Sequence, residues 1–159
     1  MRNSRPFRFA LPLVAVLAVA LGSVAQAQLG AGDIHGRAPR VIDSGLLDFG
    51  GQPVYLYGLR GLRPGETCPR AGAQWDCGQE AYWATRNRIA HHWVDCLERA
   101  RGPGGEVFAV CYLGGVGGPE LNAWLVEQGW ARAARDYSQD YADAEDAARS
   151  AGLGLWRSR

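Results

Sequence analysis

The residues best suited to chemistry lie in the stretch 41–63, VIDSGLLDFGGQPVYLYGLRGLR. An Asp-Ser-Gly elbow that starts at Asp43 stands at one end, and the loop Gly-Leu-Arg-Gly-Leu-Arg stands at the other. Tight turns between short strands would bring these loops together, so we predict a site where they meet. Arg60 and Arg63 offer planar guanidinium forks that suit phosphate or carboxylate groups. Tyr55 and Tyr57 could add stacking or hydroxyl contacts, and together these residues favour binding of an anion. The alternative is that both arginines are ordinary solvated loop residues.

A metal site could in principle be assembled from other polar residues. The candidates are Asp43, Glu66, Glu80, His91, His92 and Glu106. Two or three carboxylates could hold a hard cation. Simpler roles compete, because Asp43 suits a turn cap, Glu80 suits the first turn of a helix, and adjacent histidines on a strand face opposite sides. Glu106 could form a salt bridge with Arg60 or Arg63. A zinc site is disfavoured because C-x-x-C and H-x-x-x-H spacings are missing.

The first 27 residues have the pattern of a secretory signal peptide. Three arginines precede an apolar run at residues 9–21, and Ala25-Gln26-Ala27 is a small-x-small cleavage site. We therefore expect an exported protein, periplasmic or secreted, that is cut after Ala27 and has a short tail at residues 28–35. The alternative is a retained N-terminal anchor, although the apolar run is short for a stable membrane span.

The charge balance argues against a general electrostatic grip on nucleic acid. Of 17 basic and 16 acidic residues, the leader holds three basic and no acidic ones, which leaves a net charge of −2. Binding to a phosphate backbone needs clustered excess positive charge. Any contact with an anionic ligand or a nucleic acid is therefore expected locally, at Arg60 and Arg63.

Four cysteines in an exported small domain predict disulfides. The segments HHWVDCLER and EVFAVCYL read as two strands joined by the turn Arg101–Gly105. Centring an antiparallel hairpin on that turn places Cys96 opposite Cys111, near bridging range. Cys68 and Cys77 then remain to close a small loop ahead of a helix.

The remaining patterns predict a small α+β fold. We expect strands at 35–43, limited by Pro39 to an edge or a bulge, and at 46–49 and 52–57 around the hairpin signal Gly50-Gly51. A long loop at 58–76 leads to a helix at 78–90, the disulfide-linked hairpin, a helix at 120–128 and a last helix capped by Ser138. Five strands with about three packed helices fit a partly open barrel of the OB type.

The motifs along this chain resemble those of the staphylococcal nuclease-like (thermonuclease) family. They are V-I-D-x-G-x-L from Val41, V-x-L-Y-G-L from Val54, W-x-C-G-x-x-A from Trp75, L-N-x-x-L-V-x-x-G-W-A from Leu121, Y-S-x-x-Y-x-x-A-E-x-x-A-R from Tyr137 and G-L-W at Gly154. The resemblance covers most of the predicted domain, residues 36–159. It implies a five-stranded OB-fold barrel and a Ca²⁺-dependent phosphodiesterase.

Carried over residue by residue, the resemblance implies an altered site. The family's Asp-Gly-Asp-Thr motif falls on Asp43 to Leu46, so the second Asp is Gly45. The family's arginine on the third strand becomes Tyr55, the Asp and Glu of Asp-x-Pro-Glu become Arg60 and Arg63, and the arginine of the later Gly-Arg pair becomes Glu106. These five positions carry a net charge of +1, and two arginines would repel a divalent cation. The resemblance thus predicts the nuclease fold without catalytic or metal-binding residues.

Three functions follow as hypotheses. The first is an exported non-catalytic binding or scaffold module that holds an anion at Asp43, Tyr55, Arg60 and Arg63. The second is a metal-dependent nuclease that cleaves DNA or RNA through a non-standard site. The third is a subunit of an envelope assembly that uses tryptophans as interface anchors, with Trp75, Trp83 and Trp93 as the candidates.

Overall fold

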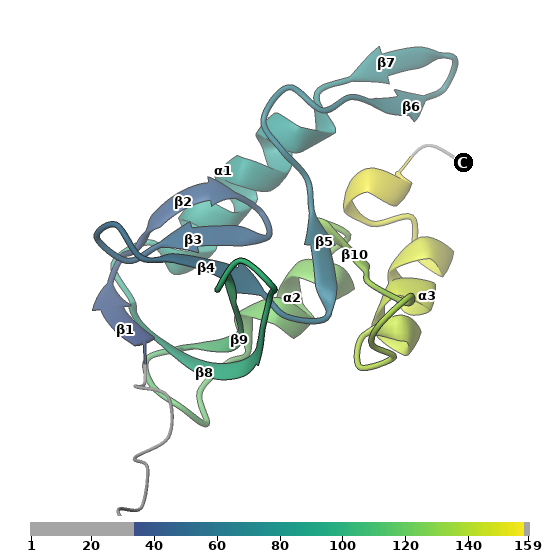
Figure 1. The fold of residues 1–159 in the computed structure, drawn as a ribbon. Coiled ribbons are helices and arrows are strands. Elements are labelled where there is room, and N and C mark those ends of the chain that lie inside the picture. The colour runs from purple at the N-terminus through teal and green to yellow at the C-terminus, as the bar shows by residue number, and fades with distance from the viewer. Residues whose placement is uncertain (1–33, 158–159) are drawn as a thin grey trace, which may run out of the picture. The chain divides into compact units, whose positions relative to one another are not determined.

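Two halves of one N-terminal segment form both edges of the main β-sheet. A computed structural model describes residues 34–157, so the expected signal peptide lies outside the described residues. The six strands follow the order β1-β8-β9-β4-β3-β2, with β1 at Ile34–Arg37 and β2 at Arg40–Asp43. Ala38 has a φ of 47°, and Pro39 lacks an N–H for a ladder bond. The single strand predicted at 35–43 is therefore two strands, and the sheet curls strongly into a half-barrel (Figure 1).

A glycine hairpin joins the next two strands, as predicted. The strands are β3 (Leu46–Asp48) and β4 (Pro53–Leu56). Gly50 and Gly51 have φ values of 70° and 101°, which only glycine adopts readily. The Gly51 N–H donates to the Asp48 carboxylate at 2.7 Å. The strand β4 then pairs in parallel with β9. This pair joins the strands β2, β3 and β4 to the rest of the sheet.

The longest strands form the disulfide-linked hairpin, β8 (Trp93–Arg101) and β9 (Val107–Leu113). Cys96 lies opposite Cys111, and the two are joined by a disulfide, as the centred turn predicts. A bulge between Glu98 and Ala100 changes the pairing register by one residue in the part of the hairpin that lies next to the turn.

The expected long loop at 58–76 contains three short strands instead. The strand β5 (Leu59–Gly61) pairs with β10 (Ala131–Ala133), a strand that the sequence patterns do not predict. The strands β6 (Cys68–Arg70) and β7 (Ala73–Trp75) form a hairpin that projects away from the main sheet in Figure 1. The second disulfide, Cys68–Cys77, closes this hairpin at its base.

Three helices form close to their predicted positions; the first two pack against the main sheet, and the last packs against the second helix and β10. The helix α1 (Cys77–Ile89) begins where the Asp76 carboxylate accepts the Gln79 N–H, and it contacts β2. The helix α2 (Leu121–Glu127) contacts β9 and is followed by Gly129 with a φ of 69°. The last helix, α3 (Ala142–Ser150), starts four residues beyond the predicted cap. Ser138 instead accepts the Asp140 N–H within the preceding turn.

Two apolar clusters lie on different sides of β5. The larger lies between the sheet and α2 and includes Leu47, Leu56 and Leu125. The smaller lies under the β6–β7 hairpin and includes Leu62, both cysteines of its disulfide, and Trp156 of the short 3-10 helix η1 (Gly154–Trp156). Within residues 34–157, no helix has the length and apolar character needed to cross a membrane.

Candidate functional site

The two loops singled out in the sequence do meet, and they border a cleft of about 620 Å³. The cleft is lined by Asp43, Gly45, Leu46, Tyr55, Leu56, Leu59, Arg60, Gly61, Arg63, Glu66, Phe108, Arg132 and Tyr137. Of the six residues that sequence reasoning assigned to the site, the structure gathers Asp43, Gly45, Tyr55, Arg60 and Arg63 here. Glu106 lies elsewhere.

Hydrogen bonds of the Ser44 hydroxyl hold the Asp-Ser-Gly elbow against the facing loop. Ser44 is fully buried, and its Oγ accepts the Leu62 N–H at 2.7 Å while donating to the Trp130 carbonyl at 2.7 Å. The Ser44 N–H also donates to the Leu62 carbonyl at 3.3 Å. These bonds join the elbow, the segment after β5 and the segment after α2. The spacing of the two loops is therefore set by these hydrogen bonds.

Two glycines pack directly against each other at this junction. A Cβ atom at position 45 would lie 2.7 Å from the Gly61 nitrogen and 2.9 Å from its Cα. A Cβ at position 61 would collide with the Gly45 backbone and lie 2.8 Å from the Asp43 carboxylate. Neither position has room for a side chain in this arrangement. The Gly61 backbone thus occupies the space that a side chain at position 45 would need.

The Asp43 carboxylate acts mainly on its own turn. Its Oδ1 accepts the Gly45 N–H at 2.7 Å, which is the turn-capping role considered above. Burial raises its pKa above the usual value, although the Gly45 hydrogen bond and the nearby Arg63 charge act in the opposite direction. Among the cleft residues, only Asp43 and Glu66 are acidic.

Three arginines line the cleft, and they differ in how they are paired. Arg60 forms an exposed ion pair with Asp136 at 2.5 Å, which lowers the pKa of that carboxyl. Arg132 pairs with Glu66 at 3.1 Å. Arg63 forms no ion pair among residues 34–157, and its side chain is exposed. Arg63 is therefore the cation best placed to receive an anion from solution.

Aromatic rings form the other wall of the cleft. Tyr55 stacks on Phe108 with ring centroids 5.3 Å apart. The Tyr137 hydroxyl accepts the Gly58 N–H at 3.2 Å, and its ring meets Tyr57 edge-on at 5.7 Å. Partial burial raises the pKa of Tyr137, so its hydroxyl stays protonated at neutral pH.

Sequence reasoning missed several cleft residues. Arg132 and Tyr137 reach the cleft only through β10 and the segment after it, and the three-residue strand β10 gives no periodic signal. Phe108 lies in the apolar stretch of β9, where its sequence pattern is the same as that of a core residue. Glu66 was considered as a metal ligand but not as the partner of an arginine.

Glu106 does not take the predicted position. Its carboxylate accepts the Gly104 N–H at 2.9 Å within the β8–β9 turn, and its side chain is exposed. The suggested salt bridge from Glu106 to Arg60 or Arg63 is wrong, because Arg60 pairs with Asp136. The short turn holds Glu106 against its own backbone and away from the cleft.

The other candidate metal ligands are dispersed. Glu80 lies in the first turn of α1, 3.8 Å from Arg157, while His91 and His92 are exposed just before β8. Within the described chain, no three His, Cys, Asp or Glu side chains gather into a metal-binding group. Calcium takes six to eight oxygen ligands. With Gly61 against Gly45 and arginines beside Asp43, the cleft residues do not fit the Ca²⁺ implied by the family resemblance.

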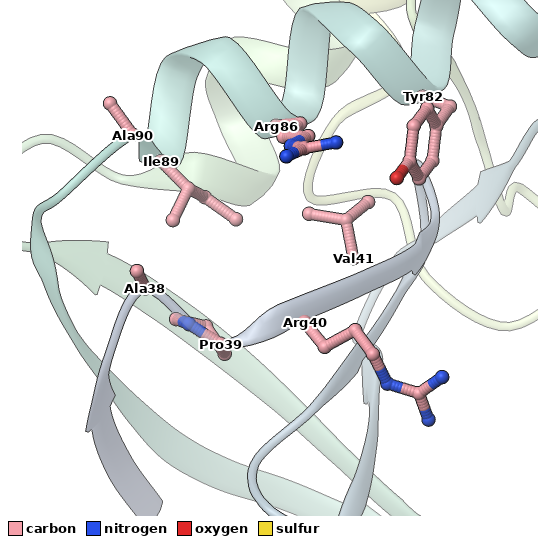
Figure 2. A pocket seen from close by; sticks show the side chains of 8 residues that line it. All are labelled: Ala38, Pro39, Arg40, Val41, Tyr82, Arg86, Ile89 and Ala90. Carbon is pink, nitrogen blue, oxygen red and sulfur yellow. The ribbon is translucent and has the colours of Figure 1, made fainter.

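A second groove of about 370 Å³ lies between β2 and α1. Figure 2 shows Arg86 and Tyr82 of α1 above the side chain of Val41, whereas the guanidinium of Arg40 points away. Arg40 pairs with Asp48 at 2.8 Å, and Arg86 lies over the Trp83 ring, 5.1 Å from its centroid. The α1–β2 groove shares no residue with the cleft.

The suggested interface tryptophans fall into two groups. Trp83 and Trp93 are 47% and 46% exposed. Trp75 is partly buried against the smaller apolar cluster. Surface exposure fits an interface but does not identify a partner, so the envelope assembly stays a prediction.

Comparisons with known proteins agree with this architecture. The succinoglycan biosynthesis protein ExoI of Rhizobium meliloti (strain 1021) is 29% identical over 123 residues, which are 75% of this chain and 63% of that protein. The chain therefore spans less than two thirds of that relative's length. The family model for the staphylococcal nuclease homologue matches residues 59–158, which include β5, both disulfides and all three helices. With the curled sheet and its three helices, this match shows that the chain belongs to the staphylococcal nuclease homologue family.

Proposed function

We propose that this domain is an exported, non-catalytic receptor that binds an anionic group in the cleft without cleaving it. The observation that carries the proposal is Arg63, an unpaired guanidinium in a cleft whose carboxylate positions are replaced. Arg60 and Arg132 add positive charge on either side, although each already has a carboxylate partner. An arginine fork binds phosphate and carboxylate with two parallel hydrogen bonds.

The close contact of Gly45 with Gly61 supports the non-catalytic part of the proposal. Metal-assisted phosphodiester cleavage needs several oxygen ligands and a base for the attacking water. Here the elbow supplies one carboxylate, and that carboxylate is engaged with the Gly45 N–H. The former positions of the other acids hold Arg60 and Arg63, whose charges would oppose a divalent cation.

Export rests on separate observations. The leader pattern and the two disulfides are typical of an oxidising compartment outside the cytosol. The Rhizobium relative is named for succinoglycan biosynthesis, and this name favours glycans as candidate ligands beside nucleic acids.

Binding can be tested by isothermal titration with short oligonucleotides and with pyrophosphate. We expect binding by the mature chain and about tenfold weaker binding by Arg63→Ala, because a charge-assisted hydrogen bond contributes about 1.5–3 kcal/mol. Arg86→Ala in the α1–β2 groove is the matched control and should bind like the native chain. No binding of any probe, or binding that ignores both Arg60→Ala and Arg63→Ala, would contradict the proposal.

A residual phosphodiesterase is the second candidate, favoured by the presence of Asp43 and Glu66 in one cleft. A nuclease assay with Ca²⁺, Mg²⁺ or Mn²⁺ decides between the two. Cleavage that a chelator stops and that Asp43→Asn abolishes would establish the enzyme. A native chain that shows no nuclease activity but still binds anions through Arg63 would support the receptor function.

A further inference from the structure

The projecting β6–β7 hairpin borders a cavity that is distinct from both the cleft and the α1–β2 groove. This hairpin cavity measures about 300 Å³ and lies between the hairpin and η1, which are neighbours in Figure 1. It is lined by Cys68, Pro69, Arg70, Ala71, Gly72, Arg132, Leu155 and Trp156.

The hairpin cavity adjoins the cleft at Arg132, the residue that lines both. The Arg132 guanidinium pairs with Glu66 on the cleft side. Only Thr67 separates Glu66, which lines the cleft, from Cys68, which lines the hairpin cavity. Arg132 is therefore placed to contact a linear ligand that extends from the cleft toward the hairpin cavity.

The charge of the hairpin cavity is wholly positive. Arg70 and Arg132 line it, and none of its lining residues is acidic. Arg70 is exposed, lies 5.7 Å from the centroid of the Trp75 ring, and forms no ion pair within residues 34–157. Arg63 and Arg70 thus give each of the two cavities one arginine without an ion pair among the described residues. A ligand that uses both must carry negative charge at more than one point along its length.

The remaining surface of the hairpin cavity suits a sugar better than a nucleobase. Bases bind single-strand receptors by stacking on open aromatic faces. Here Arg149 lies over the Trp156 ring at 4.0 Å, and Arg70 lies over Trp75. Pro69 and Leu155 instead offer aliphatic surface beside the arginines. The apolar face of a pyranose that bears a carboxylate matches this combination.

The hairpin is tied to the cleft loop at its base. The Glu66 carbonyl accepts the Gly78 N–H at 3.0 Å and lies 3.4 Å from the Cys77 sulfur. The Cys68–Cys77 disulfide thus connects the hairpin to the residue that pairs with Arg132. The two cavities are held in fixed relation before a ligand arrives.

We propose that the cleft and the hairpin cavity together bind an acidic polysaccharide, with one charged sugar at Arg63 and a second one, further along the same polymer, at Arg70 and Arg132. This inference rests on the proposed function, since it extends the anion site of the cleft. It assigns the hairpin a role in recognising chain length and charge spacing.

The test compares digalacturonate with an oligogalacturonate long enough to span both cavities, by isothermal titration to the mature chain. The longer acid should bind more tightly, and Arg70→Ala should weaken the longer acid by about three- to tenfold while leaving the shorter one unchanged. Arg63→Ala should weaken both. Gln74→Ala, on the same hairpin but outside the cavity lining, is the matched control, and circular dichroism checks that each variant is folded.

The outcomes separate the two proposals. The hairpin site would be overturned, and the receptor function kept, if both acids bind with equal affinity and only Arg63→Ala, not Arg70→Ala, weakens their binding. The receptor function itself would be overturned if Arg63→Ala leaves the binding affinity for both acids unchanged. Equal binding of a neutral malto-oligosaccharide, or tighter Arg70-dependent binding of a single-stranded oligonucleotide, would overturn the assignment to an acidic polysaccharide.

Discussion

The cleft and the α1–β2 groove are both flanked by arginines, yet their surroundings differ. In the cleft, Arg63 forms no ion pair within residues 34–157, and the opposing backbones meet at Gly45 and Gly61. In the groove, Arg40 is neutralised by Asp48 and Arg86 lies over an indole ring. The number of arginines alone therefore does not define an anion site. What matters is whether the fold supplies their counter-charges.

The largest effect should come from adding an atom at the glycine junction. Gly45→Ala places a Cβ within 3.0 Å of the Gly61 backbone, so the two loops must separate. We expect a loss of about 1–3 kcal/mol in the free energy of unfolding, measured with urea, together with weaker anion binding. Gly45→Asp is the matched variant, because it adds the same Cβ and a carboxylate. A Ca²⁺-dependent gain of stability in Gly45→Asp alone would show that the loops can reopen into a metal site.

A smaller effect of opposite sign is expected at the edge of the α1–β2 groove. Ala90 follows α1 with φ 43° and ψ −110°, a conformation that glycine tolerates better than alanine. Ala90→Gly should raise the free energy of unfolding by about 1 kcal/mol, because the relieved strain exceeds the entropy that glycine adds to the unfolded chain. Anion binding in the cleft should not change. A loss of stability on urea unfolding would show that the Ala90 methyl packs usefully.

The two sites should also respond to pH with opposite signs. Burial raises the folded-state pKa of Asp43, so the unfolded chain loses its proton first as the pH rises above about 4. Asp43 therefore reduces stability at neutral pH, and Asp43→Asn should stabilise the chain there. This advantage should disappear below the unfolded pKa. Unfolding curves measured across acidic and neutral pH provide the check.

Asp48, the ion-pair partner of the groove residue Arg40, should show the opposite dependence on pH. Its hydrogen bond from Arg40 lowers its folded-state pKa, so its contribution to stability is present above the unfolded value. That contribution is lost as the pH falls through the folded pKa. Asp48→Asn should thus destabilise the chain slightly at neutral pH and have no effect in strong acid. Identical pH profiles for the Asp43 and Asp48 variants would contradict the assigned environments.

Features carried by local patterns were predictable from the sequence. The Gly50-Gly51 hairpin, the helix that ends before Gly129, and the opposition of Cys96 and Cys111 each depend on a few neighbouring residues. The meeting of the elbow with the arginine loop followed from short strands and tight turns. These features need no knowledge of distant parts of the chain.

Features that depend on pairing between distant segments were not predictable. The strands β5 and β10 have three residues each and lie about seventy positions apart, so neither shows periodicity and Arg132 could not be placed in the cleft. Gly45 and Gly61 each read as ordinary turn residues, and only the folded chain shows that they touch. Glu106 was misplaced because a side chain can fold back on its own turn.

The buried hydroxyl of Ser44 has a consequence for binding thermodynamics. By joining three segments of the chain, it preorganises this corner of the cleft. A ligand that arrives there does not have to order loops, so little of its interaction energy is spent on conformational entropy. Recognition at this corner should therefore resemble the docking of a rigid template rather than the folding of a loop around its ligand.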